Sequence, residues 1–349
     1  MQSDLFVPSQ LTLLRELEGT FKSDLAKDLG VSPATITGWE NGARVPSSAN
    51  VRRLSVRFGV DPDYFTYLDQ SPSADKPFFR SLRSTTVAER TKSASYANVA
   101  ERTIRTLDER VNFPSFRDFG LIGFETPEES AEIVRSELGL GTEPIPNLID
   151  VVEAAGIFVV FGPKSSTSVD AFSRISHPNP IVVLNPAKND YYRQRFDLAH
   201  EVGHIALHSS EQAGSKVIEQ EANRFAAELL APSEIICDYL PKSVTSGGWK
   251  QLRILKEQWG ISMQSLLYRS NHLGIMSDQA YRNAMVTVSK RGWRRGEPGN
   301  RSMLESPTLL PSAISLLNEF GYGPDDVARE AGVPLKSLQQ VIRHAPALS

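Results

Sequence analysis

The chain has a single cysteine, Cys237, among 349 residues. One cysteine excludes an internal disulfide and fits a reducing compartment. No stretch approaches the roughly 18 consecutive apolar residues of a membrane-spanning helix, and the start, Met-Gln-Ser-Asp, does not have the character of a signal peptide. We therefore expect a cytoplasmic protein with no membrane partner.

A strong charge of one sign is also absent. The 38 Lys and Arg residues nearly balance the 41 Asp and Glu residues, and the net charge of −3 indicates no class of partner. Hydrophobic residues make up 40% of the chain and charged residues 23%, as in an ordinary globular protein. The length exceeds that of one typical domain and predicts two or three.

One apolar, helical stretch, residues 196–208, contains the pattern H-E-x-x-H. Helical spacing places His200 and His204 one turn apart on the same face. Two imidazoles so placed can hold one Zn²⁺, and the carboxylate of Glu201 can polarise a water bound to that metal. Taken alone, the pattern fits equally well a pair of helix histidines with a chance glutamate between them.

A second helical stretch, residues 217–230, supplies candidates for the third protein ligand that a catalytic zinc site needs. Glu219 and Asn223 are one helical turn apart, and the small residues between and after them would let two helices approach closely. Glu221 and Glu228 are the competing carboxylates.

The two stretches together resemble the H-E-x-x-H and E-x-x-A-N/D helices of gluzincin-type zinc peptidases, and in particular the ImmA/IrrE family of bacterial metallo-endopeptidases. The resemblance covers residues 130–275 and includes stretches similar to the family's sheet region at 144–148, 169–174 and 181–186. It implies that Glu219 is the third zinc ligand and that Asn223 orients a ligand histidine. Ala231 departs from the family, which usually has methionine there. Members of the family resemble switches that cut one site in a repressor.

His208 continues the helix face of the first two histidines. It does not fit the pattern H-E-x-x-H-x-x-G-x-x-H, in which the third histidine follows the second by six residues. We expect His208 beside a metal ligand or on the substrate side, or as an ordinary, partly buried histidine. The residue that stabilises the oxyanion is not identified by the sequence; the candidates are Arg174, His208 and Tyr192.

Residues 25–42 predict two short helices joined by a glycine turn, with Ser32 as the N-cap and Pro33 as the first residue of the second helix. This is a helix-turn-helix, and the string to residue 65 resembles the Cro-type repressor domain of the XRE family. The resemblance implies double-stranded operator DNA as a partner. The expected contacts to the major groove are Ala34, Thr35, Thr37 and Gly38, and the expected contacts to phosphates are Lys22 and Arg44.

The charge of this N-terminal module argues for weak DNA binding by a monomer. Residues 1–66 contain seven Lys and Arg against eight Asp and Glu, and DNA affinity depends on neutralising phosphates. A homodimer or help from elsewhere is therefore expected. Residues 290–301 carry five cations and one anion, which fits a DNA backbone contact, an anion site, a substrate groove or a solvated loop. The helix-turn-helix could instead bind a protein.

The predicted fold is multidomain and mainly α with an α+β core. An all-α helix-turn-helix bundle (1–67) is followed by a linker and connecting helix (68–128), with a proline-rich linker at 69–77. A zincin-like metallopeptidase domain (129–280) with a small β-sheet precedes a basic loop and helical tail (281–349). Strands are expected at 156–161 and 181–184. Residues 325–340 form a second helix-turn-helix-like string without an aromatic anchor, which we interpret as a helical cap.

The leading hypothesis is a DNA-binding transcriptional regulator fused to a zinc-dependent endopeptidase that cleaves a repressor or another regulatory protein. Glu201 would act as the catalytic base. The alternative is a non-proteolytic XRE-family regulator or antitoxin that uses the peptidase fold as a protein-binding scaffold. A purely structural zinc site is a third reading, and manganese or iron could also occupy two histidines and a carboxylate.

Overall fold

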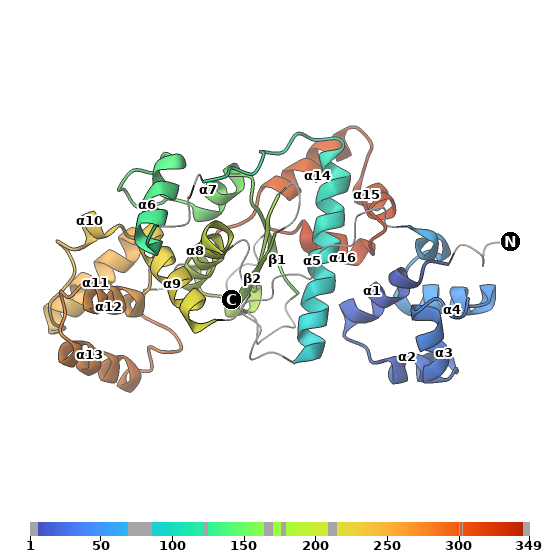
Figure 1. Ribbon diagram of the computed structural model, residues 1–349, viewed down its shortest axis with the longest axis horizontal. Coiled ribbons are helices and arrows are strands. Elements are labelled where there is room, and N and C mark those ends of the chain that lie inside the picture. Colours follow the sequence, from blue (N-terminus) through green and yellow to red (C-terminus); the bar gives the residue numbers. More distant parts are fainter. Residues whose placement is uncertain are drawn as a thin grey trace.

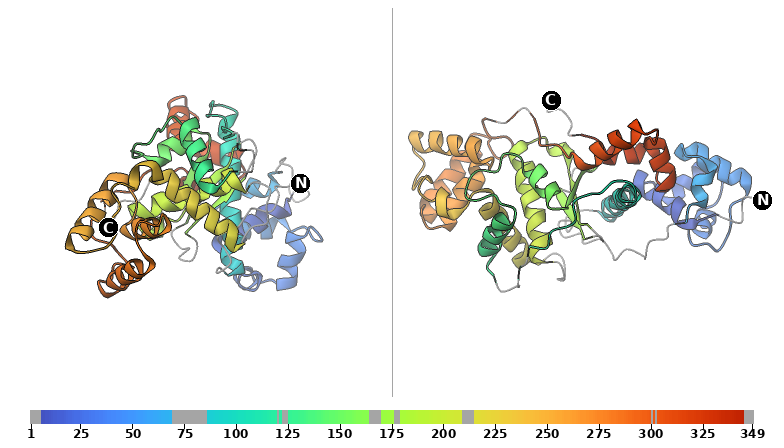
Figure 2. Two further views of the ribbon diagram at one scale, coloured as in Figure 1. Left: turned by 60° about the vertical axis from the view of Figure 1, so that its left-hand side comes forward. Right: turned by 90° about the horizontal axis from the view of Figure 1, so that it is seen from above.

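The computed structural model describes residues 6–68, 86–119, 121, 125–163, 170–175, 179–208, 215–299, 301 and 303–344. The elements lie in a row, with the N-terminal helices at one end, a small sheet and its flanking helices in the middle, and α10 to α13 at the other end (Figure 1). The view from above shows the same order (Figure 2). The expected linker at 69–77 lies outside the described residues. Within the described residues, no helix is long and apolar enough to cross a membrane.

The N-terminal bundle has a core of its own, as the sequence predicts. Its apolar side chains, among them Ile36 and Trp39, pack into one buried cluster. Ser32 accepts a hydrogen bond from the backbone amide of Thr35 and so caps the second helix of the expected motif. The elements are α1 (Pro8–Glu18), α2 (Lys22–Leu29), α3 (Pro33–Glu40), α4 (Ser48–Phe58) and the 3₁₀ helix η2 (Pro62–Thr66).

Helix α5 (Val87–Asp108) stands between this bundle and the sheet (Figure 1). A capping box between Thr86 and Glu89 fixes its start. Half of its residues are buried, because one side packs on the sheet and the C-terminal helices while another contacts α1. The connecting helix that the sequence predicts at 86–111 is therefore a central element of the fold.

The sheet has three strands in the order β1-β3-β2, with β1 parallel and β2 antiparallel to β3. All four residues of every strand are buried, because both faces are covered. Alternate residues point to opposite sides of the sheet. Val159 and Val182 face the helices that contain the H-E-x-x-H and E-x-x-A-N motifs, whereas Phe158 and Val183 face α5. The strands are β1 (Phe158–Phe161), β2 (Ala171–Arg174) and β3 (Ile181–Leu184).

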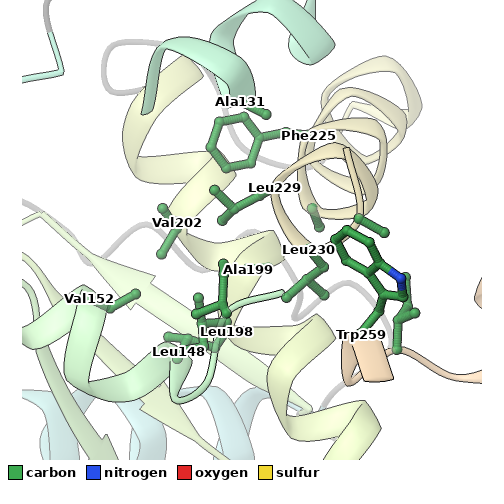
Figure 3. Packing of buried hydrophobic residues seen from close by; sticks show 14 of the residues in the cluster. Ala131, Leu148, Val152, Leu198, Ala199, Val202, Phe225, Leu229, Leu230 and Trp259 are labelled. Carbon is green, nitrogen blue, oxygen red and sulfur yellow. The ribbon is translucent and has the colours of Figure 1, made fainter. Parts of the chain in front are cut away.

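The helices on the first side of the sheet carry the H-E-x-x-H and E-x-x-A-N motifs. Figure 3 shows side chains of these helices, including Ala131, Val202, Phe225 and Leu229, gathered in one core. Gly203 permits the close crossing, because a Cβ atom there would lie 2.9 Å from the ring of Phe225. The elements are α6 (Pro127–Glu137), α7 (Leu148–Ala154), the 3₁₀ helix η4 (Pro186–Lys188), α8 (Tyr191–Leu207) and α9 (Lys216–Leu230).

The remaining helices fall into two groups. The first group continues the core beyond α9. Two of the expected domain boundaries do not fall between elements: 128/129 lies inside α6, and 280/281 lies inside α13. Ala284 and Val288 of α13 are buried in the same core as α8 and α9, which is why that helix belongs with them. This group comprises α10 (Ser233–Ile236), α11 (Ser246–Trp259), α12 (Met263–His272) and α13 (Asp278–Lys290).

The second group returns across the molecule to α5. Its buried side chains, such as Val327 and Leu338, join the cluster on the outer face of the sheet. The string at 325–340 therefore packs as a cap against α5, as interpreted from the sequence. The group comprises α14 (Leu309–Glu319), α15 (Pro324–Glu330) and α16 (Leu335–Val341).

Candidate metal centre and DNA-binding face

Helix α8 carries the first half of the site. It begins at Asp190, whose carboxylate accepts hydrogen bonds from two backbone amides of the first turn, and it continues to Leu207. His200 and His204 are one turn apart, with their rings in edge-to-face contact and centroids 4.6 Å apart. This is the shared helix face that the spacing predicts.

Helix α9 brings Glu219 to these histidines. One oxygen of its carboxylate lies 3.3 Å from Nε2 of His200, and the other lies 3.7 Å from Nε2 of His204. The three potential ligand atoms all lie within 4.8 Å of one another, and they form the one such cluster found among the described residues. The competing carboxylates are used elsewhere: Glu221 bonds His208, and Glu228 bonds Ser233 and Arg269.

The chemistry of these three residues fits a divalent metal. Two neutral imidazole nitrogens and a carboxylate are the donor set of a catalytic zinc site that leaves one position open. The buried Oε1 atom of Glu219 accepts no hydrogen bond from the part of the chain that the structure describes. A cation between these groups would satisfy that oxygen.

The charges at the site also favour a cation. Burial opposes the ionisation of Glu219, but the neighbouring imidazoles of His200 and His204 outweigh burial and lower the pKa of Glu219 to about 2. Burial likewise opposes the charge on His200, but its bond to Glu219 and the charge of Glu201 outweigh burial and raise its pKa. The site therefore attracts positive charge, as a proton or as a metal ion.

Both ligand histidines have a partner for the ring nitrogen that faces away from Glu219. Nδ1 of His200 donates to Oδ1 of Asn223 at 3.0 Å, as the resemblance implies. Nδ1 of His204 lies 3.3 Å from Nδ1 of His208. His208 therefore lies beside a candidate metal ligand, one of the placements that the sequence leaves open.

Two acidic side chains of α8 lie close to the histidines, one of them buried and the other, Asp197, 19% exposed. Glu201 is only 2% exposed. Asp197, which the sequence analysis overlooked, lies one turn earlier, and burial raises its pKa to about 7 against the opposing charge of Arg193. A carboxylate three residues before the first histidine is the sequence signal that could have drawn attention to it.

The exposed part of the N-terminal motif is narrower than expected. Ala34 and Thr37 are exposed and Thr35 is half-exposed, with its hydroxyl bonded to Ser32. Gly38 departs from the expectation, because it is buried beneath the side chain of Arg44 and offers no surface to a base. Of the four residues expected to contact the major groove, Ala34, Thr35 and Thr37 are at least partly exposed.

The two expected phosphate contacts differ in their surroundings. Arg44 is exposed beyond the end of α3. Lys22 forms an ion pair of 2.9 Å with Glu40, which also binds Arg15. Phosphate binding by Lys22 would therefore compete with this carboxylate.

Comparison with known protein families agrees with both halves of this picture. Residues 152–271 match the Peptidase M78 family, described as the IrrE N-terminal-like domain, and residues 11–65 match a helix-turn-helix family. The chain joins these two domains. No curated protein matches it.

In the region that matches the IrrE N-terminal-like domain, each of the three candidates for an oxyanion stabiliser already has a polar partner within the chain. Arg174 pairs with Glu101 of α5 at 2.7 Å. The hydroxyl of Tyr192 donates to the carbonyl of Gly299, and His208 contacts His204 and Glu221.

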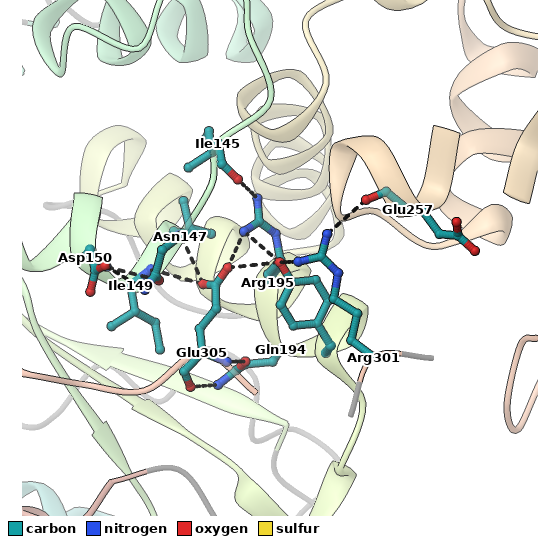
Figure 4. Close-up of polar contacts among 11 residues, drawn as sticks. Ile145, Asn147, Ile149, Asp150, Gln194, Arg195, Glu257, Arg301 and Glu305 are labelled. Atoms are coloured by element: carbon teal, nitrogen blue, oxygen red, sulfur yellow. Dashed lines mark hydrogen bonds and ion pairs between the residues drawn. The ribbon is translucent and has the colours of Figure 1, made fainter. Parts of the chain in front are cut away.

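A buried ion pair anchors the N-terminal half of α8 in this domain. Arg195 is fully buried and bonds the carboxylate of Glu305, which lies between Arg195 and the start of α7 (Figure 4). The other oxygen of Glu305 accepts from the backbone amides of Leu148 and Ile149. Sequence reasoning missed this pair, because 110 residues separate its members and no motif connects them.

The basic segment 290–301 is folded onto the domain. The guanidinium of Arg291 lies over the ring of Trp249 in α11, and that of Arg301 lies over Tyr191 in α8. Glu297 accepts from the backbone amides of Met263 and Gln264 at the start of α12. At least part of the segment is thus a structural connection between α11, α12 and α8.

Proposed function

We propose that this chain is a transcriptional regulator in which the IrrE N-terminal-like domain is a zinc-dependent endopeptidase that cleaves a repressor or another regulatory protein. One observation carries the proposal: His200, His204 and Glu219 converge from two helices, and Glu201 follows the first of them in the chain. Zn²⁺ is the metal that this donor set favours.

The residues divide the chemistry among them. His200, His204 and Glu219 would hold Zn²⁺, which would supply Lewis-acid activation of water at neutral pH. Glu201 accepts a proton from the attacking water and delivers it to the leaving amine. Asn223 holds the ring of His200 in the orientation that presents Nε2 to the metal.

The helix-turn-helix domain supplies the location. We infer that it binds operator DNA through α3 in the cytoplasm, with Arg44 and Lys22 on the phosphates, and that two copies of the chain bind together. Attachment to DNA would raise the effective concentration of a repressor bound nearby. Sedimentation analysis with and without duplex DNA tests the dimer.

The mechanism is tested by Glu201→Gln in the full chain, with Glu234→Gln of α10 as an exposed control. Each variant is incubated with Zn²⁺ and with regulators encoded beside its gene, and cleavage is followed by mass spectrometry. We expect the Glu201 variant to keep its metal and lose cleavage, while the control cleaves normally. Cleavage retained by Glu201→Gln would refute the mechanism.

The scaffold alternative is separated by metal content. At saturating Zn²⁺, we expect one zinc in the wild type and in Glu221→Ala, and its loss in Glu219→Ala. No metal in the wild type would favour a DNA-binding regulator with an inert peptidase fold.

A further inference from the structure

Glu221 and His208 lie behind the candidate metal site and are not assigned a role by it. Nε2 of His208 lies 2.9 Å from Oε2 of Glu221, and Nδ1 of His208 lies 3.3 Å from Nδ1 of His204. The three side chains thus form a chain that ends on a ligand of the proposed metal.

With His208 neutral, the acceptor-only chemistry of the carboxylate sets the direction of both hydrogen bonds in this chain. An ionised carboxylate can only accept, so Nε2 of His208 must donate to Glu221. The other nitrogen of a neutral His208 is then an acceptor, and Nδ1 of His204 must donate to it. The lone pair of His204 is left on Nε2, the atom that faces Glu219.

We propose that Glu221 and His208 fix His204 in the tautomer protonated on Nδ1 and thereby set the affinity of the site for its metal. This inference rests on the proposed metal site. Glu221 and His208 act through His204, so they are positioning residues.

The two ligand histidines are held in different ways. His200 donates to the neutral amide of Asn223, whereas His204 donates to an imidazole backed by a carboxylate. The side chains of His204 and His208 are 2% and 3% exposed, so water cannot readily replace either partner. The side chain of Glu221 is about a third exposed, so its carboxylate forms the solvent-facing end of this hydrogen-bonded chain.

Without the carboxylate of Glu221, His208 would no longer be required to carry its proton on Nε2. With its proton on Nδ1, His208 would donate to Nδ1 of His204 and move the proton of His204 to Nε2. That proton would have to leave before a metal could bind. Loss of a partner behind a metal ligand typically weakens binding by about 10–100-fold.

The test measures the zinc dissociation constant of the full chain by competition with a chelator. We expect Glu221→Leu to weaken binding by about 10–100-fold. Glu221→Gln should stay within about threefold of the wild type, because its carbonyl oxygen can still accept from His208. Gln220→Leu, an exposed neighbour on α9, is the matched control and should bind like the wild type.

The outcomes separate the two proposals. If the wild type binds no zinc, the metal site itself fails. If the wild type binds zinc and Glu221→Leu binds equally well, the tautomer chain is overturned while the metal site stands.

A second measurement on the wild type does not depend on any variant folding. Nitrogen-15 NMR of histidine-labelled, zinc-free protein at neutral pH reports which ring nitrogen carries the proton. We expect His204 to be protonated on Nδ1 and His208 on Nε2. A His204 proton on Nε2 would overturn the inference.

Discussion

The chain contains two similar helix-turn-helix-like strings, residues 25–42 and 325–340, that have opposite surroundings. Each has a helix, a left-handed glycine and a second helix: φ is +64° at Gly30 and +59° at Gly332. A Cβ atom at Gly30 would meet nothing within 4 Å, whereas one at Gly332 would lie 2.2 Å from the ring of Tyr67. The first turn is open and the second is buried against the N-terminal domain.

The difference extends to the polar groups. The carbonyl of Gly332 accepts hydrogen bonds from Gln10 of α1 and from Arg102 of α5, and Arg102 also donates to Gln10. The second string thus holds the helix-turn-helix domain against the rest of the chain. The same local pattern can therefore produce a recognition motif or an internal brace, and its surroundings decide which.

The largest effect is expected from a side chain in the buried turn. Gly332→Ala should lower the free energy of unfolding by about 2–5 kcal/mol, since a left-handed alanine costs about 1–2 and the overlap with Tyr67 about 1–3. Gly30→Ala should cost about 1–2 kcal/mol, the backbone contribution alone. Urea unfolding measures both, and equal losses would contradict the comparison.

The second largest loss of stability is expected from the polar contacts of Gln10 and Arg102 with the carbonyl of Gly332. Arg102→Met leaves the carbonyl of Gly332 and the amide oxygen of Gln10 with fewer donors, which should cost about 1–3 kcal/mol. Because Gln10 and Arg102 share a hydrogen bond, adding Gln10→Leu should cost less than the sum of the single effects. Arg52→Met on the exposed face of α4 is the control. Strict additivity of the two changes would show that they do not act together.

A negative charge on each exposed helix face separates the two strings by function. Thr37→Glu on α3 should weaken binding to duplex DNA at low salt by about tenfold or more, equivalent to about 1.4 kcal/mol. Gln339→Glu, at the matching position of α16, should leave the affinity unchanged. Fluorescence anisotropy gives both values. Equal losses would mean that the second string also approaches DNA.

The smallest effect concerns helix capping. The hydroxyl of Ser32 accepts from the amide of Thr35 at 3.1 Å, whereas α16 begins at Pro334 without a side-chain cap. Ser32→Ala should therefore cost about 1 kcal/mol of stability. Ser337→Ala in the first turn of α16 should stay within about 0.5 kcal/mol of the wild type. Thermal unfolding of the two variants checks this, and a neutral Ser32→Ala would show that the cap is dispensable.

Local patterns predicted the parts of the molecule that depend on neighbouring residues. Helical spacing put His200 and His204 on one face, and the turn at Gly30 with its cap at Ser32 marked the first motif. The choice of Glu219 over Glu221 and Glu228 came from the family resemblance of the second helix. The shared histidine face and the capped turn follow from the period of the helix and from short-range hydrogen bonds, so the sequence alone determined them.

Tertiary structure decided what the same patterns do. The sequence could not show that Arg195 pairs with Glu305, that Glu221 reaches His208, or that Gly38 lies under Arg44, because these contacts depend on how separate elements cross. It also could not distinguish the open turn from the buried one. Burial is a property of the packed chain: a turn that has the same backbone angles binds DNA or braces a domain according to which side chains cover it.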